Sequence, residues 1–266
     1  MTSSTATTRT STVSALLARE LHNTVVWLGC GFDRPPSRDA VDRFLTDLEH
    51  VVDNIFDHLV EQAARRGLLD LIYCIDSTDV RAMPADQDAS KCYEPTDQEY
   101  YYGYGCTIVS TGQKIPIAAE FTDSKQAPEE TAMRLTRDAL AVAKPIWMVG
   151  DSAYDTLDWH DHLLAAGVVP VAPYNARKTS STGSKTVLKN TARTQLKQST
   201  LDKTYNRRIG VERTNESIKG CDLGQTHARG RVHARAQVFL ELCLRLVVAI
   251  TNYERGDNPG STVITV

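Results

Sequence analysis

The sequence lacks an apolar run long enough to span a membrane, which takes about 18–20 residues. The best candidate, residues 239–250, is shorter and contains Glu241 and Arg245. The N-terminus, MTSSTATTRTS, has no apolar core of the kind found in secretion signals. We therefore expect a globular protein in the cytoplasm, with no membrane partner.

Cysteine is scarce, and its spacing excludes common metal and redox motifs. None of the six cysteines forms a CxxC pair. In a chain of 266 residues without a secretion signal, this pattern predicts free, buried thiols and not disulfides or a zinc site. The modest content of glycine (15) and proline (10) excludes collagen-like and low-complexity chains. With 41% hydrophobic residues, the chain can bury a full core.

The net charge is only −3, but the charges are unevenly distributed. Residues 1–174 contain 14 Lys and Arg against 26 Asp and Glu, a net of −12. Residues 175–235 contain 14 against 4, a net of +10. Clustered basic residues are typical of proteins that bind a polyanion, because each phosphate they neutralise releases counterions. A solvated charged loop would have the same composition, so the motifs inside this basic segment must decide between the two.

The N-terminal region, residues 1–67, is predicted to be helical. Apolar residues recur at helical spacing between Ser37 and Arg66, with Ser37 as a plausible N-cap and Gly67 as a plausible stop. Residues 13–28 suggest another helix.

The following region, residues 68–255, alternates between strand and helix patterns. Hairpins would make its first three strands antiparallel, whereas helical crossovers would make the later strands parallel. This order predicts an α/β fold in which helices flank one mixed sheet, with a polar basic insertion at about 175–203 and a tail at 256–266. The predicted strands are 68–80, 100–110, 114–121, 145–150 and 168–172, and the predicted helices are 129–143, 156–166, 208–220 and 231–253.

Two aspartates stand where predicted strands end. Asp76 follows the apolar run 71–75, and Asp151 directly follows the run 146–150. Ligands of α/β sheets tend to lie beyond the carboxyl ends of parallel strands, and a charge at the end of a buried strand is costly unless it is paired or bound to metal. The alternative is an aspartate that caps the next turn, and Asp155 is better explained as such a cap.

A third carboxylate lies inside the basic segment. On a helix, Arg208, Glu212 and Lys219 are spaced by 4 and 7 residues and would share one face. An exposed ion pair at this spacing is worth only about 0.2–0.5 kcal/mol. Together with Tyr205, however, the segment places a carboxylate among donors that bind phosphate, which is the combination a metal-dependent phosphoryl-transfer site needs.

This segment carries a resemblance to a known family. The spacing Tyr205-x2-Arg208-x3-Glu212-x6-Lys219 resembles the signature around the catalytic glutamate of DDE transposases from bacterial and archaeal insertion sequences. The segments IDST at 75–78 and GDSAYD at 150–155 resemble the first and second motifs of that family, in the same order. The resemblance covers roughly residues 68–255 and implies an RNase H-like fold.

The resemblance further implies an enzyme that cleaves element ends in double-stranded DNA and joins them to target DNA. Asp76, Asp151 and Glu212 would be the catalytic residues and would hold two Mg²⁺ ions, or Mn²⁺, because hard oxygen ligands suit these ions. Arg208 and Lys219 would bind phosphates, and Tyr205 would contact DNA or pack the helix start. Two ends must be joined together, so we expect a homodimer on DNA, associated with the nucleoid.

Two other functional interpretations of the sequence remain. A metal-dependent nuclease or resolvase of the same fold would need the same carboxylates and would differ only in the absence of strand transfer. A truncated or repurposed transposase would bind DNA without catalysis, and its carboxylates would be structural remnants. The full-length members of the family usually carry an N-terminal DNA-binding region, and residues 1–67 show no clear helix-turn-helix pattern.

Overall fold

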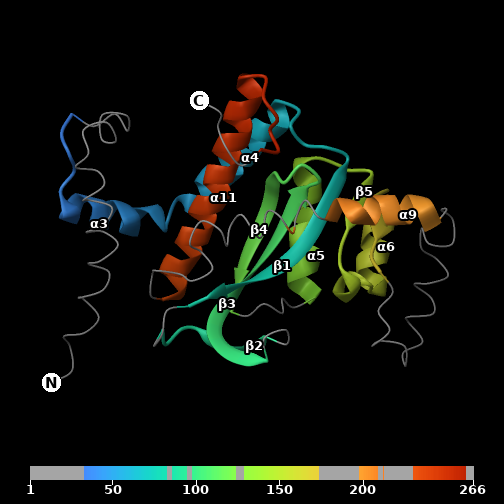
Figure 1. The fold of residues 1–266 in the computed structure, drawn as a ribbon, viewed down its shortest axis with the longest axis horizontal. Coiled ribbons are helices and arrows are strands. Elements are labelled where there is room, and N and C mark those ends of the chain that lie inside the picture. Colours follow the sequence, from blue (N-terminus) through green and yellow to red (C-terminus); the bar gives the residue numbers. More distant parts are fainter. Residues whose placement is uncertain are drawn as a thin grey trace.

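The computed structural model describes residues 33–82, 86–94, 98–123, 129–173, 198–208, 212 and 230–261. Six strands form one mixed sheet, in which β3 lies beside β1, β1 beside β5 and β5 beside β6, while β2 and β4 both pair with β3. The pairs that involve β3 are antiparallel, and β1, β5 and β6 are parallel. The mixed sheet expected of an RNase H-like α/β fold is therefore confirmed (Figure 1). The strands are β1 (Ile72–Arg81), β2 (Ser90–Glu94), β3 (Glu99–Thr111), β4 (Pro116–Thr122), β5 (Trp147–Val149) and β6 (Val169–Val171).

The helical segment predicted between Ser37 and Gly67 consists of two helices, α3 (Arg38–Leu48) and α4 (Val52–Arg65). Ser37 caps α3 as expected, and Gly67 ends the segment with φ of +73°, a conformation that glycine adopts easily. The helix breaks at residues 49–51, where Val51 leaves helical geometry with φ of −122°. This break lets α4 turn its own apolar face, with Val52 and Phe56, into the core while α3 extends away from the sheet (Figure 1).

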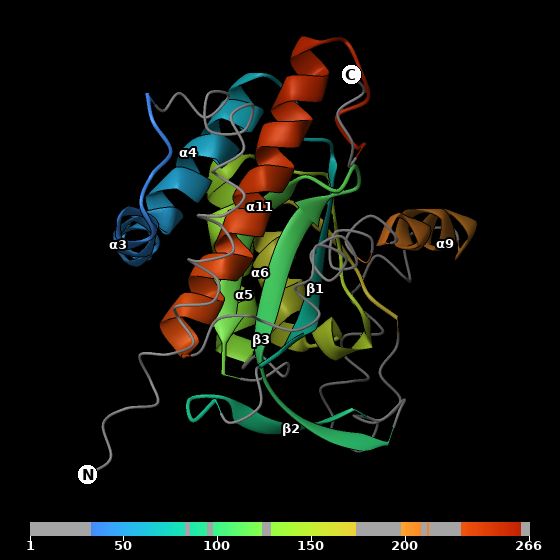
Figure 2. The ribbon, with the colours of Figure 1, turned by 60° about the vertical axis from the view of Figure 1, so that its left-hand side comes forward.

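The helices cover both faces of the sheet. On one face, the hydroxyl groups of Ser77 and Tyr154 lie 3.3 Å apart, and the Tyr154 ring packs on Trp159. Trp159 Nε1 in turn donates to Thr136 Oγ1 at 3.2 Å, which joins α6 to α5. Figure 2 shows α5 and α6 behind the sheet and α11 in front of it. These helices are α5 (Glu129–Val142), α6 (Leu157–Ala165), α9 (Gln198–Tyr205) and α11 (Arg231–Glu254), with short 3₁₀ turns η1 (Ser152–Tyr154) and η3 (Asn206–Arg208).

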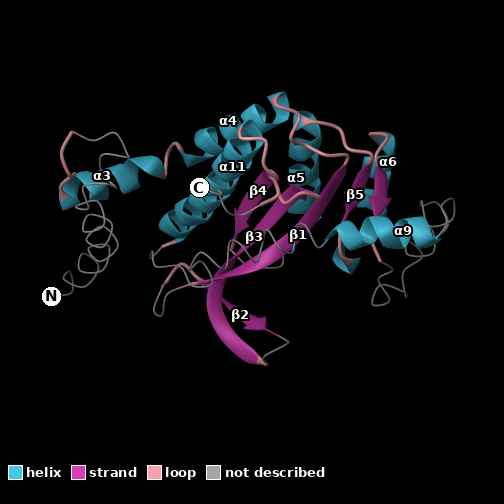
Figure 3. Ribbon diagram, turned by 45° about the horizontal axis from the view of Figure 1, so that its top comes forward, coloured by secondary structure: helices cyan, strands magenta, loops and turns pink. Residues whose placement is uncertain are grey.

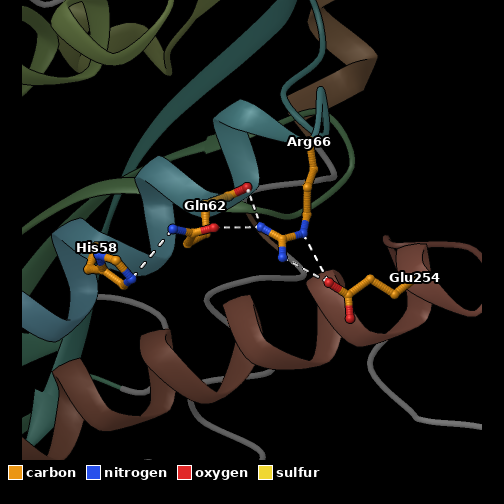
Figure 4. Close-up of polar contacts among 4 residues, drawn as sticks. All are labelled: His58, Gln62, Arg66 and Glu254. Atoms are coloured by element: carbon orange, nitrogen blue, oxygen red, sulfur yellow. Dashed lines mark hydrogen bonds and ion pairs between the residues drawn. The ribbon is translucent and has the colours of Figure 1, made fainter.

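Helices α4 and α11, which are far apart in the sequence, pack along each other. Phe56 meets Phe239 edge to face, with ring centroids 5.6 Å apart. At the other end of the pair, Arg66 donates to Glu254 Oε1 through Nε at 3.1 Å and Nη2 at 2.8 Å (Figure 4). Gln62 Oε1 accepts a further bond from Arg66 Nη1 at 2.7 Å. Contacts at both ends of the pair therefore hold α4 against α11.

None of the helices in the described ranges is long and apolar enough to cross a membrane. Four of the six cysteines lie in these ranges, and all four are free thiols, as predicted. Cys74, Cys106 and Cys243 are buried, and burial raises the pKa of each thiol. Cys30, Cys221 and the helix expected at 13–28 lie outside the described residues.

Arg245, the charge that interrupts the apolar run of α11, is a buried structural cation. Its guanidinium donates to three carbonyl oxygens, those of Lys114 at 3.1 Å, Ser261 at 2.8 Å and Pro259 at 3.0 Å. Burial lowers the pKa of Arg245 to about 10, which leaves it charged at neutral pH. The residue therefore fastens the β3–β4 turn and residues 259–261 to α11.

Replacement of Arg245 by methionine should lower the free energy of unfolding by about 3 kcal/mol, because three buried carbonyls lose a charged donor. Urea denaturation measures this loss. Arg255→Met is the matched control, since Arg255 is exposed and its contact with Asp257 is 3.6 Å long. Equal losses in the two variants would show that the carbonyl bonds of Arg245 do not stabilise the fold.

Candidate active site

The two predicted strand-end aspartates lie at equivalent positions on neighbouring parallel strands. β1 and β5 pair with Cys74 opposite Val149, so Asp76 and Asp151 each stand two residues beyond a paired position. β6 continues the same register, with Val149 opposite Val171. Only Asp151 follows the end of its strand, because β1 continues to Arg81 and Asp76 lies inside it, paired with Ile108 of β3. The register therefore places both carboxylates level with the carboxyl end of β5, and Asp76 is not the strand-end residue that the apolar run suggested.

Gly150 shapes the turn that carries Asp151. A Cβ atom at residue 150 would lie 2.9 Å from the Tyr154 ring, so only glycine lets this ring pack against the end of β5. Asp151 Oδ1 accepts a bond from the backbone N–H of Ala153 at 2.8 Å and caps η1. Asp151 therefore caps the next turn, which is the structural alternative to a role in metal binding.

Asp155, in contrast, is not the helix cap that its position suggested. Thr156 caps α6, and its hydroxyl accepts from Trp159 N. Asp155 is buried instead, with Oδ1 lying 3.4 Å from His160 Nε2. Threonine is a competent N-cap, and its place one residue nearer the helix decides which of the two side chains reaches the exposed N–H groups.

The third motif approaches the same edge from α9 and η3. The ring of Tyr205 packs against a small apolar cluster formed by Cys74, Val149 and Val171, one from each parallel strand. The Cys74 thiol donates to the carbonyl oxygen of Arg207 at 3.6 Å. These contacts seat η3 on the face of β1 that also carries Asp76. Tyr205 thus packs the segment, and the last part of the predicted exposed insertion is the helix α9.

Arg208 joins two of the three carboxylates. Its Nη1 lies 3.7 Å from Asp76 Oδ1, and its Nη2 forms an ion pair with Glu212 Oε1. The Arg208 side chain is 21% exposed and that of Asp76 is 17% exposed, so the Asp76 contact is partly withdrawn from water. The i,i+4 ion pair expected from the sequence is present, but its arginine also reaches Asp76 inside β1. Lys219 lies outside the described residues.

The electrostatics link all three carboxylates. Burial raises the pKa of Asp76 to about 6, while Arg208 lowers it and the nearby charges of Asp151 and Glu212 raise it. Burial works against the charge of Arg208, but the three carboxylates, Asp76 foremost, hold its pKa above the ordinary value. The pKa of Asp76 therefore responds to Arg208 and to both of the other carboxylates. Within the described residues, which include Asp76, Asp151 and Glu212, no three His, Cys, Asp or Glu side chains are grouped closely enough to hold a metal ion, so the structure does not bring the three carboxylates together as expected.

The raised pKa of Asp76 predicts how stability changes with pH in the absence of metal. Its pKa is about 6 in the fold against an ordinary value of 3.8, so the folded chain binds more protons between these values. The resulting stabilisation is complete below pH 3.8 and is lost as pH rises through about 6, with an upper limit of roughly 3 kcal/mol. Urea denaturation in EDTA at several pH values measures it. Asp76→Asn should flatten this part of the profile, and an unchanged profile would contradict the assignment.

The chain is similar to a known family and to two known proteins. Residues 67–247 match the model of the family described as "Transposase DDE domain". Two proteins described as "Probable transposase for insertion sequence element ISH11", from two strains of Halobacterium salinarum, are each 83% identical over 254 residues. Each match covers 93% of this chain and 77% of the relative.

Two solved structures align with the chain at 13% identity and a TM-score of 0.27. A pre-cleavage Mos1 transpososome covers 80% of this chain and 77% of its own, and the Drosophila P element transposase strand transfer complex covers 94% and 66%. These alignments are too weak to bear on the fold or the function. The family match and the 83% identical relatives are sufficient by themselves. The chain belongs to the DDE transposases of insertion sequences.

Proposed function

We propose that this transposase cleaves the ends of its element and joins them to target DNA with Asp76, Asp151 and Glu212 as the metal-binding catalytic residues. The observation that carries the proposal is the guanidinium of Arg208, which contacts Asp76 and Glu212 together. Carboxylates from a strand and from a distant segment meet at one cation, at the sheet edge where Asp151 also lies. A purely structural i,i+4 ion pair would not need Asp76.

The donor set suits divalent cations. All three side chains offer hard carboxylate oxygens, the ligands that Mg²⁺ and Mn²⁺ prefer. Burial is the main cause of the raised pKa of Asp76, and the charges of Asp151 and Glu212 add to it; a bound cation would offset both the burial of the charge and this repulsion. When bound, such ions supply positive charge at the scissile phosphate and at the attacking and leaving oxygens.

The protein's own residues account for the remaining parts of the reaction. The Asx turn at Asp151 and the contact of η3 with Cys74 position the segments that carry Asp151 and Arg208. The three carboxylates would still have to move together to share a bound cation. Arg208 offsets one of the two negative charges of Asp76 and Glu212 while they hold no cation. We infer that Arg208 then turns to the DNA backbone, where its planar guanidinium binds phosphate oxygens in pairs. Tyr205, whose ring centroid lies 5.7 Å from the Arg208 carbon Cζ, supports the guanidinium during this movement.

The test uses a duplex that carries the element end and a second duplex as the target. With Mg²⁺ the protein should produce a nick at the end and then a joined product, and EDTA should abolish both. A nuclease or resolvase of the same fold would produce the nick without the joined product. A protein that only binds DNA would produce neither. Sedimentation of the end complex would show whether two copies assemble on DNA.

A further inference from the structure

Beyond the last residue of β1, β3 continues with β2 as a two-stranded ribbon. Residues 99–103 of β3 pair with residues 90–94 of β2, whereas β1 reaches only as far as Gly103. Figure 3 shows β3 bending as it leaves the sheet and enters this ribbon. The ribbon thus projects from the carboxyl end of β1, the same end toward which Asp76 and Asp151 lie.

One side of the ribbon displays three tyrosines. Tyr93 stands opposite Tyr100 and Lys91 opposite Tyr102, so these four residues share one side, here called the tyrosine face. The tyrosines are 50%, 68% and 54% exposed for residues 93, 100 and 102. The rings of Tyr93 and Tyr100 are 5.1 Å apart, and Lys91 Nζ lies 4.4 Å from the Tyr100 ring centroid. Single exposed tyrosines are ordinary, but a continuous group of three with an adjacent cation forms a surface.

The opposite side of the ribbon is held by internal contacts. The ring of Tyr101 is buried over Gly103, where an added Cβ would approach it to 2.9 Å. The guanidinium of Arg81 lies 5.1 Å from the same ring, and Arg81 forms an ion pair with Glu99 at 2.7 Å. These contacts fix the ribbon, so that the tyrosine face is already arranged before a ligand binds.

The chemistry of the tyrosine face favours bases over phosphates. Among its four residues Lys91 alone is a cation, which is too little charge for contacts that depend on the DNA backbone. Aromatic rings next to a cation bind bases by stacking, at about 1–3 kcal/mol per base. Bases inside a duplex are already stacked on their neighbours. The surface therefore fits unpaired bases.

The tyrosine face also lies on the same side of β3 as the residue that pairs with Asp76. Asp76 is opposite Ile108, and alternation along β3 places Tyr102 and Tyr100 on the side of Ile108. Six residues separate Ile108 from Tyr102, which is roughly 20 Å along a strand. Cys106 and Tyr104 lie between them on that side and are buried, so a DNA strand that leaves the candidate active site would have to pass over this covered stretch. The distance itself is one that a few nucleotides can span.

We propose that the tyrosine face binds unpaired bases of the DNA strand that leaves the active site. The proposal rests on the proposed function, since it assumes that DNA is opened or cut beside Asp76. The tyrosine face would be a second DNA contact of the catalytic domain. This contact would prefer single-stranded to double-stranded DNA.

Fluorescence anisotropy with two probes tests this assignment, a 20-nucleotide mixed-sequence single strand and a blunt duplex of the same sequence, both in EDTA. The full chain with Tyr93, Tyr100 and Tyr102 all changed to alanine should bind the single strand at least tenfold more weakly. Its affinity for the duplex should stay within twofold. The triple change to phenylalanine should retain single-strand binding. Tyr253→Ala is the matched control, because Tyr253 is an exposed tyrosine (46%) at the end of α11.

Unchanged melting temperatures would show that the variants fold, and Tyr100→Ala alone should give an intermediate loss. Unchanged single-strand affinity, or equal losses for both probes, would overturn the proposal. Dissociation of a dimer by the alanine changes would also overturn it and would assign the face to a second copy of the chain. Because the assay needs neither cleavage nor metal, its result is independent of whether the parent protein nicks DNA.

Discussion

Glu212→Gln should abolish nicking and strand transfer, by roughly 10³-fold or more, while binding of element-end DNA stays at least as strong. The substitution keeps the shape of the side chain and removes its charge. If Glu212 holds a catalytic cation, the loss corresponds to several kcal/mol of transition-state stabilisation. Binding should not weaken, because one negative charge near the DNA backbone is removed.

The matched control for this change is Glu254→Gln. Glu254 is also paired with an arginine, Arg66, but stands at the far end of α11 and is 55% exposed. This variant should cleave at the parent rate with slightly lower stability. Cleavage by Glu212→Gln within a few-fold of the parent would reduce Glu212 to an ion-pair partner and remove the basis for the catalytic assignment.

Arg208→Ala should separate the two roles inferred for this residue. Without the guanidinium, Asp76 and Glu212 repel each other with no counter-ion, so the melting temperature in EDTA should fall. Mg²⁺ no longer competes with an ion pair and should bind more tightly, which makes the Mg²⁺-induced rise in melting temperature larger than in the parent. Nicking should still slow by roughly 10²-fold, because a charged donor at the phosphate is lost.

Melting curves across a Mg²⁺ titration, measured beside single-turnover nicking, distinguish these effects. Arg207→Ala is the control, since Arg207 is the exposed neighbour in η3. If Mg²⁺ stabilised Arg208→Ala no more than the parent, the guanidinium would not be occupying the place of a cation. If nicking were also unchanged, Arg208 would have no part in the reaction.

The sequence was most informative where apolar runs end in a charge. Strands β1 and β5 could be predicted because continuous apolar residues in a short segment favour a buried strand, and their register then brings Asp76 and Asp151 level. The break between α3 and α4 was not predictable from periodicity, since the apolar spacing continues across residues 49–51. At these residues the packing of α4 into the core outweighs the local preference for one continuous helix.

Strand β2 was missed for a related reason. Its sequence, SKCYE, has no apolar alternation, and it is stabilised by tyrosines of the neighbouring strand instead of by the core. The bridge from Arg208 to Asp76 could not be read from the sequence either. The i,i+4 spacing predicts the contact with Glu212, whereas the contact with Asp76 depends on how η3 is seated on β1. Long-range placement of this kind follows from packing alone.

The pairing of α4 with α11 has a consequence for biosynthesis. The salt bridge from Arg66 to Glu254 joins residues 188 positions apart in the sequence. Phe56 likewise cannot pack on Phe239 until α11 has been synthesised. At about 5–20 residues per second, a ribosome completes α11 roughly 10–40 seconds after α4 has been made. During that interval the nascent chain exposes the apolar face of α4, and until Glu212 is added it lacks a carboxylate of the candidate site. We expect ribosome-bound chains to need chaperone cover and to be unable to cut the DNA from which they are expressed.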